Sequence, residues 1–81
     1  MNADEIRQHV TAVPFREFVL HVADGRTIPV HGRDFILISP RGLTVDVYQP
    51  DERHDILDAA LISGIAFAVP PAASQSQSSN P

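Results

Sequence analysis

Short runs that alternate between apolar and polar residues dominate the middle of this chain. Four such runs follow one another, at residues 15–22, 26–30, 35–38 and 43–48. Asp24-Gly25 separates the first pair, and Ser39-Pro40-Arg41-Gly42 separates the second. Alternation with a period of two is typical of strands that bury one face, and turn residues between such strands indicate antiparallel hairpins. The pattern therefore predicts a protein built mainly from β-hairpins.

The first hairpin allows two registers, and the polarity of its two faces selects between them. A two-residue turn at Asp24-Gly25 would pair Phe18 with His31 and would mix polar and apolar side chains on each face. A three-residue loop with its glycine in the left-handed conformation pairs Leu20 with Ile28. We expect this second register, because it gathers five apolar side chains on one face. These side chains are Phe18, Leu20, Val22, Ile28 and Val30.

The same type of turn fits Ser39-Pro40-Arg41-Gly42 in the second hairpin. Proline suits the first central position of a type I turn, and the glycine that follows suits a left-handed bulge position. The corresponding register sets Leu37 opposite Val45 and Phe35 opposite Val47. We therefore expect these four side chains to face the core.

In that register Ile36 and Ile38 point to the opposite face, which is unusual for a strand that is half in water. Together with Val19 they exceed the apolar content that a one-sided sheet needs, and a large exposed apolar patch usually marks an interface. Either the apolar face of an N-terminal helix or a partner could cover them. We therefore predict Val19, Ile36 and Ile38 as interface residues.

A short helix is predicted near the start of the chain, over residues 3–13. Asn2 is a good N-cap, and Glu5 stands three residues later, as in a capping box. Ile6 and Val10 lie four positions apart and therefore on one face of the predicted helix. Pro14 restricts the residue before it and ends the helix. Because so short a helix is unstable alone, we expect it to dock on the sheet.

The sequence allows two interpretations of residues 51–63, either a helix or a strand followed by a turn. The helical interpretation uses Asp51 as the cap and Gly64 as the terminator. The alternative pairs residues 55–59 as a strand and then makes one helical turn. Both interpretations end with a strand over residues 64–69, where apolar residues alternate with alanine.

The composition changes at Pro70. Residues 70–81 contain no aliphatic side chain larger than alanine and are rich in serine, glutamine and proline. Such a segment cannot offset its own ordering entropy, so we predict a disordered tail. Residues 2–69 are then expected to form one small domain, as suits a chain of 81 residues.

Several short motifs carry a resemblance to known proteins. They are Asp4-Glu5-Ile6-Arg7, Pro14-Phe15-Arg16-x-Phe18, Asp24-Gly25-Arg26 and Asp34-Phe35-Ile36-x-Ile38-Ser39. Together they resemble a group of short uncharacterised bacterial proteins, over roughly residues 3–67. The resemblance implies a strand, a tight turn and a strand over residues 55–67, and it implies a fold but no activity.

One helix followed by five strands, with a helical turn before the last strand, is also similar in topology to Sm-like and SH3-like small barrels. The expected fold is therefore mainly β with one N-terminal helix, either a curled antiparallel sheet or a small five-stranded barrel. RNA binding is what the Sm-like resemblance would imply, and Arg26, Arg41 and Tyr48 are the residues that we predict to contact RNA in that case.

The charge distribution argues against a general nucleic-acid binder. The formal net charge is −4, and the six basic residues are arginines scattered along the chain. Affinity for nucleic acid rests largely on clustered cations that neutralise phosphates. The chain contains no cysteine and no apolar run near the roughly 20 residues of a membrane span. With no signal peptide recognisable at the N-terminus, we expect a cytoplasmic protein without membrane association.

No motif in the sequence indicates catalysis or metal binding. His21 and His31 share one face of the first hairpin but lie roughly 13 Å apart, too far to share a metal ion. The densest acidic run, residues 51–58, is typical of a solvated loop. We therefore expect no cofactor and a non-enzymatic interaction module, for which self-association through a strand edge or the Ile36/Ile38 face is one mode.

Overall fold

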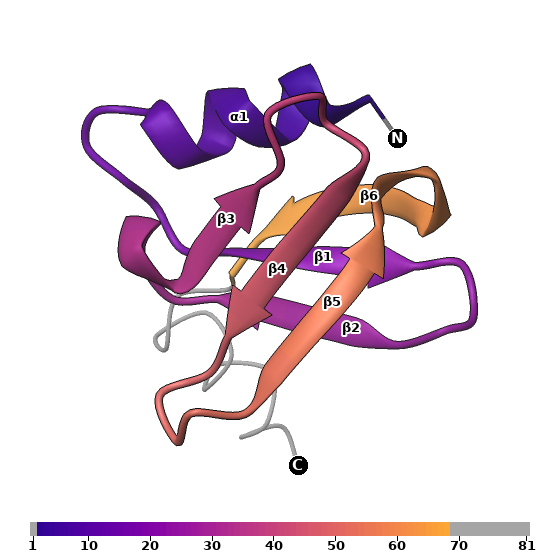
Figure 1. Cartoon of the computed structure of the whole chain (residues 1–81). Coiled ribbons are helices and arrows are strands. Elements are labelled where there is room, and N and C mark those ends of the chain that lie inside the picture. Colours follow the sequence, from indigo (N-terminus) through magenta and orange to yellow (C-terminus); the bar gives the residue numbers. More distant parts are fainter. Residues whose placement is uncertain (1, 69–81) are drawn as a thin grey trace, which may run out of the picture.

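Two three-stranded antiparallel sheets and one helix make up the part of the chain described by the computed structural model, residues 2–68 (Figure 1). The predicted tail over residues 70–81 lies outside the described residues. In chain order the elements are α1 (Ala3–Thr11), β1 (Phe18–Val22), β2 (Thr27–Val30), the 3-10 turn η1 (Arg33–Phe35), β3 (Ile36–Ile38), β4 (Thr44–Tyr48), β5 (His54–Asp58), the 3-10 turn η2 (Ala59–Leu61) and β6 (Ile62–Phe67). One sheet has the order β2-β1-β6 and the other β3-β4-β5. The mainly β class with one helix is confirmed, and within residues 2–68 the strands form no closed barrel.

Helix α1 begins where the sequence predicts. The Asn2 side chain accepts a hydrogen bond from the Asp4 N–H at 2.8 Å, which satisfies one of the first free amides of the helix. The predicted end at residue 13 is wrong, because the helix stops at Thr11 and Ala12 is already extended. The Ala12 carbonyl accepts a hydrogen bond from the Arg33 guanidinium. That contact spans 21 positions of the sequence and has no local signal.

The first hairpin has the predicted register. Leu20 pairs with Ile28, and Phe18 pairs with Val30. The Val22 N–H donates to the Arg26 carbonyl at 2.9 Å, which closes the three-residue loop. Gly25 has a φ of +98°, the left-handed conformation expected at this bulge position.

The second hairpin has a different register from the predicted one. Ile36 pairs with Val47 and Ile38 with Val45, while Leu37 pairs with Asp46. The faces of β3 are therefore exchanged. Ile36 lies in the core at 8% exposure, whereas Leu37 is 66% exposed on the opposite face.

The cause of this difference is a loop that holds one residue more than a three-residue turn. The Ser39 N–H donates to the Thr44 carbonyl at 2.9 Å, so the strands close one position later. The Ser39 hydroxyl oxygen accepts the N–H groups of Leu43 and Thr44, both at 3.0 Å, and so supports the wider loop. Gly42 still adopts the predicted left-handed conformation, with a φ of +74°. The wider loop thus turns Ile36 and Ile38 toward the core in place of the predicted Phe35 and Leu37.

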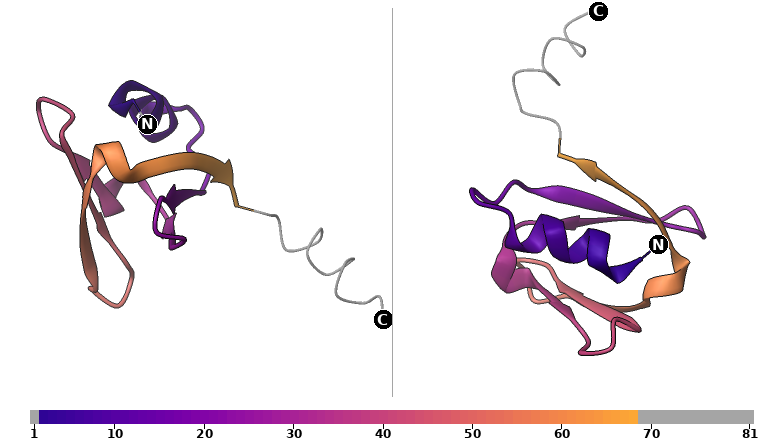
Figure 2. Two further views of the ribbon diagram at one scale, coloured as in Figure 1. Left: turned by 90° about the vertical axis from the view of Figure 1, so that its right-hand side faces the viewer. Right: turned by 90° about the horizontal axis from the view of Figure 1, so that it is seen from above.

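For residues 51–63 the strand alternative is confirmed, because residues 54–61 form a strand and a 3-10 turn. Strand β5 pairs along its full length with β4, and η2 then leads directly into β6. The Asp58 side chain accepts the Ala60 N–H at 3.0 Å and caps η2. This short turn carries the chain from the β3-β4-β5 sheet to the β2-β1-β6 sheet, as both views in Figure 2 show.

The core lies between the two sheets and beneath α1. Helix α1 crosses one end of the pair of sheets, as Figures 1 and 2 show. Its Ile6 side chain is completely buried among strand residues, as the docking of a short helix requires. The buried set comprises Ile6, Phe18, Leu20, Val22, Ile28, Val30, Ile36, Val45, Val47, Leu57, Ala59 and Ile62.

Candidate functional site

The face of the β3-β4-β5 sheet that points away from the core carries the largest exposed side chains of that sheet. We call it the outer face and define it by alternation with the buried residues of the same strands. Its members are Leu37, Thr44, Asp46, Tyr48, His54, Ile56 and Asp58. Leu37 and Ile56 are 66% and 67% exposed, and Tyr48 is 44% exposed. The predicted register of the second hairpin placed Leu37 in the core and therefore missed it as a member of this face.

Leu37, Asp46 and Ile56 form one row across the three strands. Asp46 pairs with Leu37 on β3 and with Ile56 on β5, so two aliphatic side chains flank its carboxylate. Residues directly opposite on neighbouring strands have Cβ atoms about 5 Å apart. The Asp46 side chain is therefore flanked by an aliphatic side chain on each neighbouring strand, and it remains 29% exposed.

Tyr48 and His54 form the next row. Their rings stack with centroids 4.0 Å apart and planes only 5° from parallel. The His54 Nε2 lies 3.8 Å from the Asp46 Oδ2, which is beyond hydrogen-bond distance. Two flat rings and one carboxylate thus adjoin each other at one end of the outer face.

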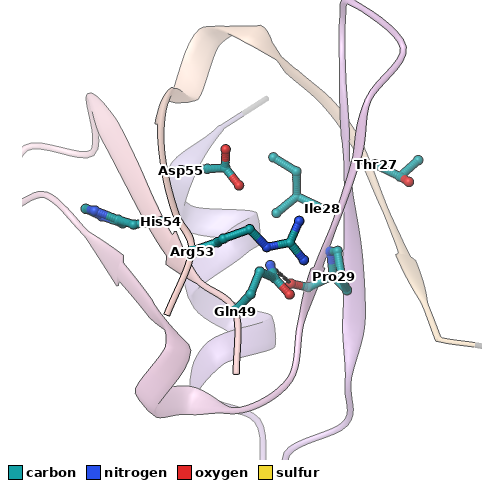
Figure 3. A pocket seen from close by; sticks show the side chains of 7 residues that line it. All are labelled: Thr27, Ile28, Pro29, Gln49, Arg53, His54 and Asp55. Carbon is teal, nitrogen blue, oxygen red and sulfur yellow. Dashed lines mark hydrogen bonds between the residues drawn. The ribbon is translucent and has the colours of Figure 1, made fainter. Parts of the chain in front are cut away.

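A groove of about 420 Å³ lies between β2 and the start of β5 (Figure 3). Its lining residues are Thr27, Ile28, Pro29, Gln49, Arg53, His54 and Asp55. The Gln49 Nε2 donates a hydrogen bond to the Pro29 carbonyl at 3.0 Å, which links this edge strand to the β4–β5 turn. Arg53 extends across the groove toward β2 (Figure 3). The groove therefore has a polar wall, to which Gln49, Arg53 and Asp55 contribute.

Two hairpin turns repeat one local arrangement, in which an aspartate binds the arginine two residues later. Asp24 accepts the Arg26 backbone N–H at 3.0 Å and its Nε at 2.8 Å. Asp51 accepts the same groups of Arg53 at 3.1 Å and 2.8 Å. The backbone N–H groups of Arg26 and Arg53 lower the pKa of the Asp24 and Asp51 carboxyls below their ordinary value of 3.8. Both guanidinium charges are thus paired within their own turns.

The residues predicted to contact RNA are not brought together. Arg26 is paired with Asp24 and lies 3.8 Å from Asp55. Arg41 belongs to the loop that precedes β4, and Tyr48 ends that same strand. Five strand residues span roughly 13 Å from first to last, so Arg41 and Tyr48 lie at opposite ends of β4.

The three predicted interface residues do not form one patch either. Ile36 is part of the core, so its predicted position on the opposite face is wrong, because the wider loop shifts the register of β3. Ile38 is half-buried and packs against the core. Val19 is half-buried on the other sheet, where it pairs with Pro29 and Ala66. The Ser39 hydroxyl is the one signal in the sequence that could have indicated the wider loop, and with it the exposure of Leu37.

Residues 2–68 include no group of three or more histidine, aspartate or glutamate side chains that could hold a metal ion. No helix in this described part is long and apolar enough to cross a membrane. Comparison with protein-family models, curated proteins and solved structures found no match for this chain.

Proposed function

We propose that this chain is a non-enzymatic interaction module that binds a partner protein on the outer face. The observation that carries the proposal is the pair of largely exposed side chains Leu37 and Ile56 beside the half-exposed ring of Tyr48. Completely burying an aliphatic or aromatic side chain is worth about 1.5–3 kcal/mol. Two aliphatic side chains that are two-thirds exposed, next to a tyrosine that is 44% exposed, are therefore apolar surface that a bound partner would cover.

Site-specific photo-crosslinking in cells tests this proposal. A crosslinking amino acid in place of Ile56 should capture a partner, because the side chain points outward at 67% exposure. The same amino acid in place of Val13, which is 90% exposed after α1, is the matched control and should capture nothing specific. Equal crosslinking at both positions, or none at position 56, would contradict the proposal.

Self-association is one mode of this function. If a second copy occupies the outer face, the mass measured by light scattering should rise with protein concentration and should remain that of a monomer in Ile56→Asp. Ile56 is exposed, so this variant should keep its fold, which a thermal melt would verify. A monomeric wild-type protein across micromolar concentrations would exclude this mode while leaving a different partner in place.

RNA binding by an Sm-like or SH3-like barrel is the alternative function. The order of elements supports it, because a helix precedes the strands and the 3-10 turn η2 precedes the last strand. This alternative predicts a salt-dependent affinity for single-stranded RNA that falls in Arg26→Ala or Arg41→Ala. No binding at low salt would remove it. The pairing of Arg26 within its own turn favours the interaction module.

A further inference from the structure

We propose that the outer face recognises an arginine side chain of its partner. This inference rests on the proposed function. The guanidinium would bind the Asp46 carboxylate, its aliphatic stem would lie between Leu37 and Ile56, and its plane would face the side of the Tyr48 ring that the stacked His54 ring leaves open. Each part of this assignment follows from a separate feature of the outer face.

The first feature is the state of the Asp46 carboxylate. Its side chain is only 29% exposed, and among residues 2–68 it accepts no hydrogen bond. The His54 Nε2 lies 3.8 Å from its Oδ2, beyond hydrogen-bond distance. A carboxylate has about four acceptor positions, and a charge in an apolar surrounding is stabilised when a donor fills them. Asp46 therefore offers a partner an acceptor that the folded chain leaves open.

The second feature is the sign of the charge on this face. Asp46 and Asp58 are its acidic residues, and no lysine or arginine belongs to the outer face as defined by the register. The whole chain carries a formal charge of −4. Electrostatic complementarity thus favours a basic partner segment and disfavours an acidic one.

The third feature is the arrangement of apolar surface around Asp46. Leu37 lies on one side of it and Ile56 on the other, both in direct cross-strand register. The methylene stem of a long cationic side chain packs on such surface while its charged head reaches a polar group. A short acidic or polar side chain could not make both contacts.

The Tyr48 ring in the next row distinguishes arginine from lysine. Tyr48 lies two residues from Asp46 on the same face of β4, so the two side chains are neighbours. A guanidinium is planar, binds a carboxylate through two parallel hydrogen bonds and stacks on aromatic rings, whereas an ammonium does neither. The combination of Asp46 and Tyr48 therefore matches a guanidinium.

The test uses the isotope-labelled full chain, titrated by NMR with an acetylated and amidated Val-Arg-Val tripeptide. The expected shifts centre on the amides of Leu37, Asp46 and Ile56. Replacing the arginine by uncharged citrulline should weaken binding at least tenfold, and replacing it by lysine should weaken it several-fold. Asp46→Asn should abolish the difference between the arginine and citrulline peptides. Asp34→Asn, at an exposed aspartate on η1, is the matched control and should bind like the wild type.

Three results would overturn the inference. Equal binding of the citrulline peptide would show that only the apolar residues matter, and equal binding of the lysine peptide would show that the guanidinium is not selected. Absence of any shift on the outer face would exclude arginine recognition altogether. In each case crosslinking at position 56 would still report on the interaction module, so the failure of this inference and of the proposed function can be told apart.

Discussion

Glu52 is held in a backbone conformation that suits glycine, and its replacement provides a direct test of how the hairpin turns are stabilised. Its φ is +76°, and it is the one non-glycine residue with a positive φ in the described range 2–68. It occupies the position in the β4–β5 turn that Gly25 occupies in the β1–β2 turn. The Gln49 N–H donates to the Arg53 carbonyl at 2.8 Å, just as the Val22 N–H does to that of Arg26.

The expected effect of Glu52→Gly is a gain in stability. A left-handed conformation costs an L-residue about 1–2 kcal/mol, and glycine escapes this cost. Glycine also has greater freedom in the unfolded chain, which offsets about 0.5–1 kcal/mol of the gain. The Glu52 side chain is exposed and has no hydrogen bond or ion pair among the described residues that would be lost. We therefore expect a net stabilisation of about 0.5–1 kcal/mol.

Urea unfolding monitored by circular dichroism measures the change. Gly25→Ala is the matched reverse substitution, because a Cβ on Gly25 would meet nothing within 4 Å and only the φ of +98° opposes it. It should destabilise the protein by about 1 kcal/mol. If Gly25→Ala has this cost but Glu52→Gly leaves the free energy of unfolding unchanged or lowers it, left-handed strain at Glu52 is not the determining term.

Three further predictions follow from the fold. Gly42→Ala should destabilise the protein more than Gly25→Ala, as compared by urea unfolding. Both have a strained φ, but only the new Cβ at position 42 would also lie 2.9 Å from the Cβ of Ala3 in α1. The ionised carboxylates of Asp24 and Asp51, whose pKa values are lowered, stabilise the fold fully above their ordinary pKa of 3.8, and this stabilisation is lost as the pH falls through the lowered values. The double variant Asp24→Asn with Asp51→Asn should therefore lose less stability on acidification than the wild type, as measured by unfolding over a range of acidic pH. Ile36→Ala should cost about 2–5 kcal/mol while Ile56→Ala changes stability by less than about 0.5 kcal/mol; similar costs in thermal melts would contradict the register of β3.

The first hairpin shows what local sequence determines. Asp24-Gly25 selects the turn, and any other register would place polar side chains in the core, so a single arrangement satisfies both conditions. The N-cap of α1 is equally local, because Asn2 bonds to an amide two residues away. These features depend on residues that are near one another in the chain.

The second hairpin shows where local reasoning is insufficient. Its turn residues fit both a three-residue loop and the wider loop closed by Ser39, and both registers bury Val45 and Val47. The two registers differ in β3, where the observed register buries Ile36 and exposes Leu37. Because that choice depends on how both sheets pack around one core, the turn alone could not decide it.

The candidate site likewise depends partly on local sequence and partly on tertiary packing. The sequence alone determined the first hairpin, the left-handed glycine of the second turn and the start of the helix, because each depends on the spacing of nearby residues. Only the tertiary structure decided between a helix and a strand with a turn for residues 51–63, and placed Leu37, Asp46 and Ile56 in one row on the outer face. Such a row joins three strands, and its composition depends on the pairing register, which the packing of the core selects.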